Sequence, residues 1–366
     1  MADSGDLQLF RYPQSKSVDA VRWLHPVSAF DRFIATAVHD TDDASSAVEI
    51  HSLSFSPESR NPNKPLLHLR SNWPSPSRIS ALRTSETHQK HVVAAVSTFA
   101  GSVHFLFVDP VDVSIDLELS TDECHQPLHN GPVSAVDLQS GGHECVSVGE
   151  DGRVNLVSVG EGGLIAGIQR ELRENNGISA YDEICEALAV EEASGGGGVG
   201  GPWAGRRRPG GAGEQLKACM YCSGRVDSHK PNLYDTFVVG GSSGTVFAWD
   251  LRWQQQPILL SGVSLSGTGR STCESEIWEI QYDIHAQTSS ISSTSSTKIL
   301  PVMACSEDGI LAVIEQGKPH TELLAEDCAI NSFNIDPQNP ADVVCALEWE
   351  SIGILMRAKE AASPVY

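Results

Sequence analysis

A short phrase in which apolar residues alternate with small or polar ones recurs seven times, and this repeat limits the possible folds more than any other feature of the chain. The starts of the phrases lie 61, 54, 45, 48, 51 and 53 residues apart. Alternation of this kind predicts a short β-strand with one buried face. The phrases are Val18–Trp23, Ile79–Thr84, Val133–Leu138, Ile178–Glu183, Val226–His229, Ile277–Tyr282 and Ile330–Ile335.

Most phrases are followed by a run of small and β-branched residues. Such runs are typical of strands covered on both faces, because Ala, Gly and Cys allow neighbouring sheets to approach closely. In three repeats an Asp-Gly or Ser-Gly pair, which suits a two-residue hairpin, then leads into a third strand. The runs are Phe33–Val38, His91–Val96, Cys145–Val148, Phe237–Gly240, Pro301–Cys305 and Val343–Leu347, and the third strands are Val154–Val159, Thr245–Leu251 and Ile310–Ile314.

Strands and hairpins repeated at about fifty residues, without an amphipathic helix between them, predict an all-β, seven-bladed β-propeller. Trp249–Asp250 is the dipeptide that names the WD40 class, whose period is ~40 to 45 residues. Residues 1–366 would form a single propeller domain. The longer periods here come from polar, Pro-rich or Ser-rich stretches, which we interpret as inter-strand loops: residues 57–76, 109–127, 254–274 and 288–297.

The last repeat contains three strands, and the segment Leu7–Tyr12 has no blade of its own. We therefore predict that the N-terminal segment supplies the outer strand of blade seven. Closing the ring in this way removes unpaired strand edges and ties the two ends of the domain together.

The fourth repeat breaks the pattern. Residues 182–193 favour a helix where a buried strand is expected, and residues 195–213 contain ten glycines, which weaken any strand. We expect a degenerate fourth blade with an irregular segment at 182–217. This segment is either a flexible insertion or a stretch translated through a retained intron or in a shifted frame, and we favour the second explanation.

The charge balance limits the kinds of partner. The chain has 25 Lys plus Arg against 47 Asp plus Glu, a formal charge of −22. Nucleic-acid backbones and anionic membranes need clustered basic residues, so we expect protein partners instead. The sequence shows neither a signal peptide nor an apolar stretch of ~20 residues, and nine scattered cysteines fit a reducing compartment.

No motif indicates catalysis, a metal or a cofactor. Cys219 and Cys222 form a single C-x-x-C, and P-loop, H-E-x-x-H and G-x-S-x-G patterns are absent from the sequence. Asp151 and Asp308 each occupy a Glu-Asp-Gly turn. Because they recur at equivalent positions, we assign them a structural role in which the carboxylate binds the backbone of its own turn. Trp249 and Asp250 are assigned as further structural blade positions.

Four segments carry a resemblance to a known family: Phe237–Arg252, Glu276–Tyr282, Cys305–Gly309 and Ala329–Pro340. Together they resemble the forty-three-kilodalton nucleoporin, particularly its plant form. The similarity is strongest over residues 237–357, moderate over 6–162, and lapses between about 182 and 235. In that interval Trp203 and the Arg208-Pro209-Gly210 turn are similar to the end of the family's fourth blade.

The resemblance implies a scaffold subunit of the Y-shaped outer-ring complex of the nuclear pore, located at the nuclear envelope. Its implied partners are α-solenoid and propeller nucleoporins of the short arm. Lacking the dipeptide Phe-Gly, the chain would not form the permeability barrier, and it would support transport of mRNA and protein indirectly. Small-molecule substrates, direct nucleic-acid binding and membrane insertion are not expected.

The alternative comes from another class. Trp249-Asp250-Leu251-Arg252 matches the W-D-x-R ending by which some WD40 proteins dock the adaptor of a cullin ubiquitin ligase. Arg252 would then be an exposed docking anchor of a substrate receptor. The competing explanation is that Arg252 ends a strand and neutralises acidic neighbours. An enzyme is the least favoured hypothesis, because no nucleophile, base and orienting group converge in the sequence.

Overall fold

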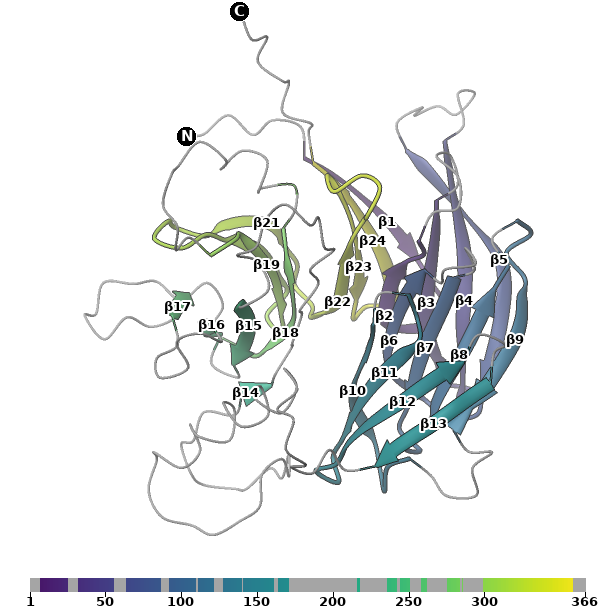
Figure 1. Ribbon diagram of the computed structural model, residues 1–366. Helices are drawn as coiled ribbons and strands as arrows, with labels where there is room; N and C mark the ends of the chain where they lie inside the picture. Colours follow the sequence, from purple (N-terminus) through teal and green to yellow (C-terminus); the bar gives the residue numbers. More distant parts are fainter. Residues whose placement is uncertain are drawn as a thin grey trace, which may run out of the picture.

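The computed structural model describes residues 7–25, 32–55, 64–86, 92–109, 111–121, 128–139, 141–160, 164–170, 216–217, 236–241, 244–250, 258–261, 275–283, 285 and 299–357. Within these residues the chain is an all-β propeller of six four-stranded antiparallel sheets (Figure 1). We number the blades after the seven predicted repeats, so that the described sheets are blades one to three and five to seven.

Each blade is a meander that runs from an inner strand near the propeller axis to an outer strand. Blade one contains β2 (Ser17–Trp23), β3 (Phe33–Asp40), β4 (Ser45–Phe55) and β5 (Pro65–Ser75). Blade two contains β6 (Ile79–Glu86), β7 (Val92–Thr98), β8 (Val103–Val108) and β9 (Ile115–Ser120). Blade three contains β10 (Val133–Leu138), β11 (Glu144–Gly149), β12 (Val154–Gly160) and β13 (Leu164–Arg170).

The second half of the chain repeats this plan. Blade five contains β14 (Leu216–Lys217), β15 (Thr236–Gly241), β16 (Val246–Asp250) and β17 (Ile258–Ser261). Blade six contains β18 (Ile277–Tyr282), β19 (Val302–Ser306), β20 (Ile310–Ile314) and β21 (Thr321–Ala325). Blade seven contains β22 (Ile330–Ile335), β23 (Asp342–Leu347) and β24 (Ser351–Met356), and its fourth strand is β1 (Gln8–Pro13).

The predicted number of blades is not reproduced, since the structure shows six sheets where seven were expected. The predicted fourth blade, including the phrase Ile178–Glu183, falls outside the described residues. So does Val226–His229, the expected inner strand of blade five. The strand that pairs with β15 there is β14, which lies inside the segment that we expected to be irregular.

The other strand predictions are confirmed. Five of the seven phrases coincide with inner strands β2, β6, β10, β18 and β22, and the six buried runs coincide with β3, β7, β11, β15, β19 and β23. Val343 to Ala346 in β23 have no exposed surface, as expected for a strand packed on both faces.

The N-terminal segment closes the ring as predicted. β1 pairs antiparallel with β24 from Gln8↔Met356 to Pro13↔Ser351, and the two strands lie side by side in Figure 1. Blade one also holds β1, because the Tyr12 hydroxyl donates a hydrogen bond to the carbonyl of Pro65. Strands from the two ends of the sequence therefore complete one sheet.

Two predictions about local structure are wrong. Three stretches expected to be loops contain the outer strands β5, β9 and β17, while 288–297 lies outside the described residues. Outer strands face solvent along one edge, and β5 has three consecutive exposed residues, so its pattern does not alternate. The hairpin turns are also longer than two residues: the Gly152 N–H donates to the Gly149 carbonyl at 3.0 Å, and Gly152 has φ 75°.

Candidate functional site

The inner strands share a backbone irregularity that sets what faces the propeller axis. In each of five inner strands the register slips within the first two paired residues, as between Ile277 and Glu279 in β18. A β-bulge of this kind increases local twist and redirects the side chains that follow. The corresponding slips occur at Val18/Ala20, Ile79/Ala81, Val133/Ala135 and Ile330/Ser332.

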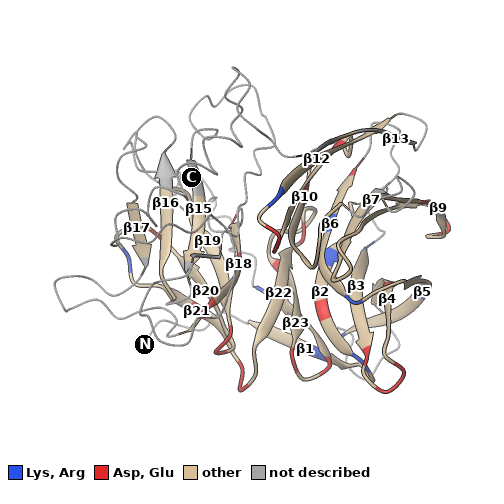
Figure 2. Cartoon of the chain, turned by 90° about the horizontal axis from the view of Figure 1, so that it is seen from below, with Lys and Arg blue, Asp and Glu red and all other residues tan. Residues whose placement is uncertain are grey.

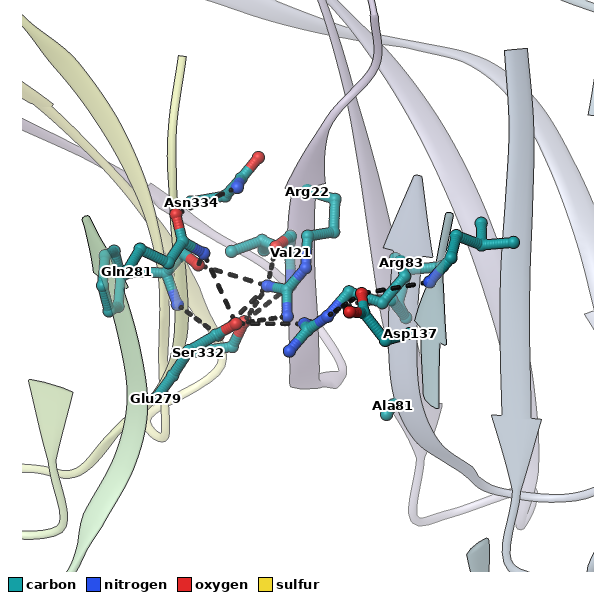
Figure 3. A network of polar contacts seen from close by, with 12 residues as sticks. Val21, Arg22, Ala81, Arg83, Asp137, Glu279, Gln281, Ser332 and Asn334 are labelled. Atoms are coloured by element: carbon teal, nitrogen blue, oxygen red, sulfur yellow. Dashed lines mark hydrogen bonds and ion pairs between the residues drawn. The ribbon is translucent and has the colours of Figure 1, made fainter. Parts of the chain in front are cut away.

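Near this axis, the carboxylate of Glu279 binds residues of three other blades through ion pairs and hydrogen bonds (Figure 3). Its carboxylate binds Arg22 of blade one in a bidentate pair, with oxygen–nitrogen distances of 2.6 and 3.1 Å. Arg83 of blade two reaches the same carboxylate at 3.0 Å. From blade seven, the Ser332 hydroxyl and the Phe333 N–H donate at 3.0 and 3.2 Å.

The network has room because the neighbouring strands carry small residues at the level of Glu279. Ala20, Ala81 and Ser332 occupy the position directly after the bulge in β2, β6 and β22, where β18 carries Glu279. Glu279 and Arg22 are each 4% exposed.

Arg83 extends the network to blade three. Its Nε lies 3.8 Å from the carboxylate of Asp137, whose side chain keeps 39% of its accessible surface. Burial raises the pKa of Asp137, and the positive charge of Arg83 opposes that rise. The side chain of Asp137 is surrounded by protein but remains accessible to water, so we expect contact with water to reduce the rise in its pKa.

Burial also raises the pKa of Glu279, while Arg83 and the hydrogen bonds from Ser332 and the Phe333 N–H act in the opposite direction. Because two guanidinium groups contact it, we assign Glu279 as ionised at neutral pH. An ion pair that is buried and fully hydrogen-bonded adds little net stability, but removing one partner leaves an uncompensated charge. The network therefore constrains how four blades are placed around the axis.

A second set of polar contacts links blades six, seven, one and two in succession. Gln281 of blade six donates from its amide to the Phe333 carbonyl of blade seven at 3.0 Å. Trp23 of blade one donates from its backbone and indole N–H groups to Asn334, at 2.8 and 3.1 Å. The Thr84 hydroxyl of blade two donates to the Trp23 carbonyl at 2.9 Å. These contacts fix neighbouring blades in one register.

Asp151 belongs to a group that has the spacing of a catalytic triad. His129 Nδ1 lies 3.0 Å from Asp151, and His129 Nε2 lies 2.8 Å from the Ser147 hydroxyl. Neither His129 nor Ser147 has exposed surface, so no substrate can reach the hydroxyl. Asp151 also accepts the Arg153 N–H of its own turn at 3.1 Å. The arrangement anchors the β11–β12 turn to the chain that enters blade three.

The pKa values of this group follow from its burial. Burial lowers the pKa of His129, although the neighbouring Asp151 opposes the shift. For Asp151, burial acts to raise the pKa, but N–H groups of Asn130 and Arg153 together with His129 hold it below its usual range. We therefore assign His129 as neutral and Asp151 as ionised at pH 7.

The remaining predicted site residues are placed as follows. Asp308 lies in the β19–β20 turn, where the Ser306 hydroxyl donates to its carboxylate and its own N–H donates to the Ser275 hydroxyl at 2.9 Å. Trp249 and Asp250 are the last residues of β16, and the structure does not describe their side chains. Arg252, the proposed docking anchor, lies outside the described residues.

The axial network was missed in the sequence analysis, although a signal existed. Arg22, Arg83 and Asp137 all stand at the fifth position of their phrases, where a charged residue interrupts an otherwise apolar or small pattern. Arg22 and Arg83 contact Glu279, and Asp137 contacts Arg83. Because Arg22 and Glu279 are 257 residues apart, these contacts depend on the closed ring.

Among the residues that the structure describes, no group of three or more His, Cys, Asp or Glu side chains is placed so that it could hold a metal ion. In the same part of the chain, no helix is long and apolar enough to cross a membrane.

Comparison with known proteins adds one close relative. No family model matches the chain. The Arabidopsis thaliana protein named "Nuclear pore complex protein NUP43" is 46% identical over 371 residues, an alignment that covers 98% of this chain and 99% of that protein. Similarity at this level over both full lengths means that the chain belongs to the NUP43 family of nuclear pore complex proteins.

Proposed function

We propose that this chain is a structural subunit of the outer ring of the nuclear pore complex, where it acts as a protein-docking propeller. The observation that carries the proposal is the 46% identity to a nuclear pore complex protein across almost the whole of both chains. We further propose that its partners are α-solenoid and propeller subunits of the short arm of the Y-shaped complex. In that position it would support transport of mRNA and protein indirectly, by holding other subunits in place.

The chemistry of the propeller supports a scaffold role rather than an enzymatic one. Its most catalytic-looking group, His129 with Asp151 and Ser147, is buried and engaged in anchoring a turn. The ion pairs between Glu279 and two arginines join blades to one another. Such groups stabilise one rigid shape, which is what a docking subunit needs.

We also propose that the ring contains seven blades, the fourth being built from residues between β13 and β14. The packing of the inner strands supports this count. Contacts link β10 to β6, β6 to β2, β2 to β22, β22 to β18 and β18 to β15. Within the described residues this series has two ends, blade three and blade five, and 45 residues, 171–215, connect those blades in the sequence.

Localisation tests the proposed function. A fluorescent fusion of the full chain should mark the nuclear rim in living plant cells and coincide there with a known nuclear pore subunit. A matched fusion of Glu279→Ala, which removes the axial carboxylate, should show a weaker rim signal because the blades are less firmly placed. A wild-type fusion spread evenly through the cytoplasm or nucleoplasm would contradict the proposal.

A further inference from the structure

One face of the propeller carries the hairpins between the second and third strands of the blades. Each hairpin lies beside the start of its inner strand, as shown by the pairs Ile330↔Leu347 and Ile277↔Ser306. We call this side the hairpin face. In Figure 2 acidic turns lie along the lower edge of the molecule, beyond β21, β23 and β4.

The hairpin face is continuous and acidic across blades six and seven. The Glu326 N–H donates to the Gly309 carbonyl at 3.0 Å, and the Glu348 N–H donates to the Ala329 carbonyl at 3.0 Å. These bonds join the blade-six hairpin, the connector 326–329 and the blade-seven hairpin into one surface, which we call the acidic patch. Its exposed carboxylates are those of Glu307, Asp308, Asp327, Glu348 and Glu350.

A tryptophan projects from this patch. Trp349, between Glu348 and Glu350, is 65% exposed, which is more than Phe55 at 48% or Phe99 at 46%. Its hairpin is held from both sides, because Glu348 binds the connector and the Gln14 N–H donates to the Glu350 carbonyl at 2.6 Å. The ring is therefore presented on a fixed support, among exposed carboxylates, and tryptophan is an aromatic residue that is enriched at interfaces.

The corresponding hairpin of blade two shows what such an aromatic ring binds. There the guanidinium of Arg78 lies 5.8 Å from the centre of the Phe99 ring. Arg78 directly precedes the inner strand β6, and the residue that directly precedes β22 in blade seven is Ala329. Within the described part of the chain, no cation lies over the Trp349 ring. In blade seven the position of Arg78 is taken by Ala329, so we infer that the Trp349 ring can receive a cation from another molecule.

We propose that the acidic patch, with Trp349 as its anchor, docks a lysine- or arginine-bearing segment of a partner protein. The carboxylates would attract the basic side chains, and the indole would offer the best aromatic surface for a cation. Tryptophan is also among the residues that most often dominate binding energy at interfaces. This inference rests on the proposed function only in that it expects the partner to be a nuclear pore subunit.

Other occupants fit less well. A nucleic-acid backbone would be repelled by five exposed carboxylates. A second copy of this chain, docked through the same patch about a two-fold axis, would place like charges opposite one another. Arg11, the basic residue beside the patch, already contacts Glu326, although its side chain is 51% exposed.

Photo-crosslinking tests the proposal on the full chain in plant cells. Trp349→p-benzoylphenylalanine should yield a crosslink to a segment of a nuclear pore subunit that has Lys or Arg within a few residues of the attachment point. The same replacement at Val111, which is 86% exposed in the β8–β9 loop on the opposite face, serves as the control and should not capture that segment. Capture of an acidic segment, of a second copy, or of the same segment from both positions would overturn the proposal.

Two matched double variants then test the role of charge. Asp327→Lys with Glu350→Lys, and separately Trp349→Ala, should each lower co-purification of the captured partner by roughly tenfold or more without lowering the melting temperature. Glu348 is left unchanged, because its carboxylate accepts the Ala329 N–H at 3.2 Å. Asp42→Lys with Asp43→Lys makes the same change of charge on the blade-one hairpin and should leave recovery within about twofold. Equal losses from both double variants would overturn the docking site. If wild-type chain recovers no nuclear pore subunit, the proposed function fails instead.

Discussion

At the scale of single residues, Glu279 of blade six joins its own blade to blades one, two and seven. It is buried and holds Arg22 and Arg83 at the propeller axis. Its two arginine partners come from blades one and two, near the other end of the sequence, so no local pattern could have identified it. Small residues, Ala20, Ala81 and Ser332, follow the bulge in three other inner strands, at the position that Glu279 occupies in β18. The sequence shows that they are small, but only the closed ring shows that they lie near the axial network.

Replacing Glu279 tests this assignment. Glu279→Ala leaves two guanidinium groups without their carboxylate and should cost about 3–5 kcal/mol in the free energy of unfolding, measured by urea titration. The exposed pair between Glu315 and Lys318 provides the control, since Glu315→Ala should cost less than ~1 kcal/mol. Similar losses in the two variants would show that the axial network is not a special constraint.

The buried histidine predicts a pH effect of definite sign. Because burial lowers the pKa of His129 in the folded state, the unfolded chain takes up its proton more readily near and below the ordinary value of ~6.5. Stability contributed by neutral His129 is therefore present above that pH and is lost as pH falls. When the pH is lowered from 7.5 to 5.5, the melting temperature of the wild-type chain should fall further than that of the His129→Gln variant. Equal falls in the two melting temperatures would contradict the assignment of His129 as neutral.

At the scale of elements, the sequence predicted the inner and second strands well and the outer strands poorly. Buried runs such as Val343–Leu347 are distinctive because both faces are apolar. The pattern of β5 and β9 does not distinguish them from loops, because partly exposed edge strands need no regular alternation. The bulges were also not predicted, since they arise from the twist that packing around an axis imposes.

The closing strand gives a prediction at this scale. Deleting residues 1–13 removes β1, leaves the edge of β24 unpaired and takes away the Tyr12 contact with blade one. The melting temperature should fall by at least about 5 °C. Arg11→Ala, which changes an exposed ion pair of the same strand, should have little effect. A truncated chain that melts like the full one would mean that β1 does not hold the ring closed.

At the scale of the whole molecule, the propeller class and its closure were predictable because repetition carries the same pattern through the chain. The blade count was not reproduced, and the difference lies where the composition changes abruptly, at 182–217. The family was recognised from motifs in the second half and is supported by identity over both full lengths. Part of the acidic charge of the chain lies on the hairpin turns, where Glu307, Asp308, Glu348 and Glu350 are exposed.

The central claim is that this closed propeller is a docking subunit of the nuclear pore. Affinity purification of the tagged full chain, followed by quantitative mass spectrometry, tests it most directly. The account predicts that outer-ring nucleoporins, including α-solenoid subunits, are recovered in amounts comparable to the bait. Recovery of a cullin and its adaptor without nucleoporins would contradict the claim and favour the ligase-receptor alternative based on Arg252.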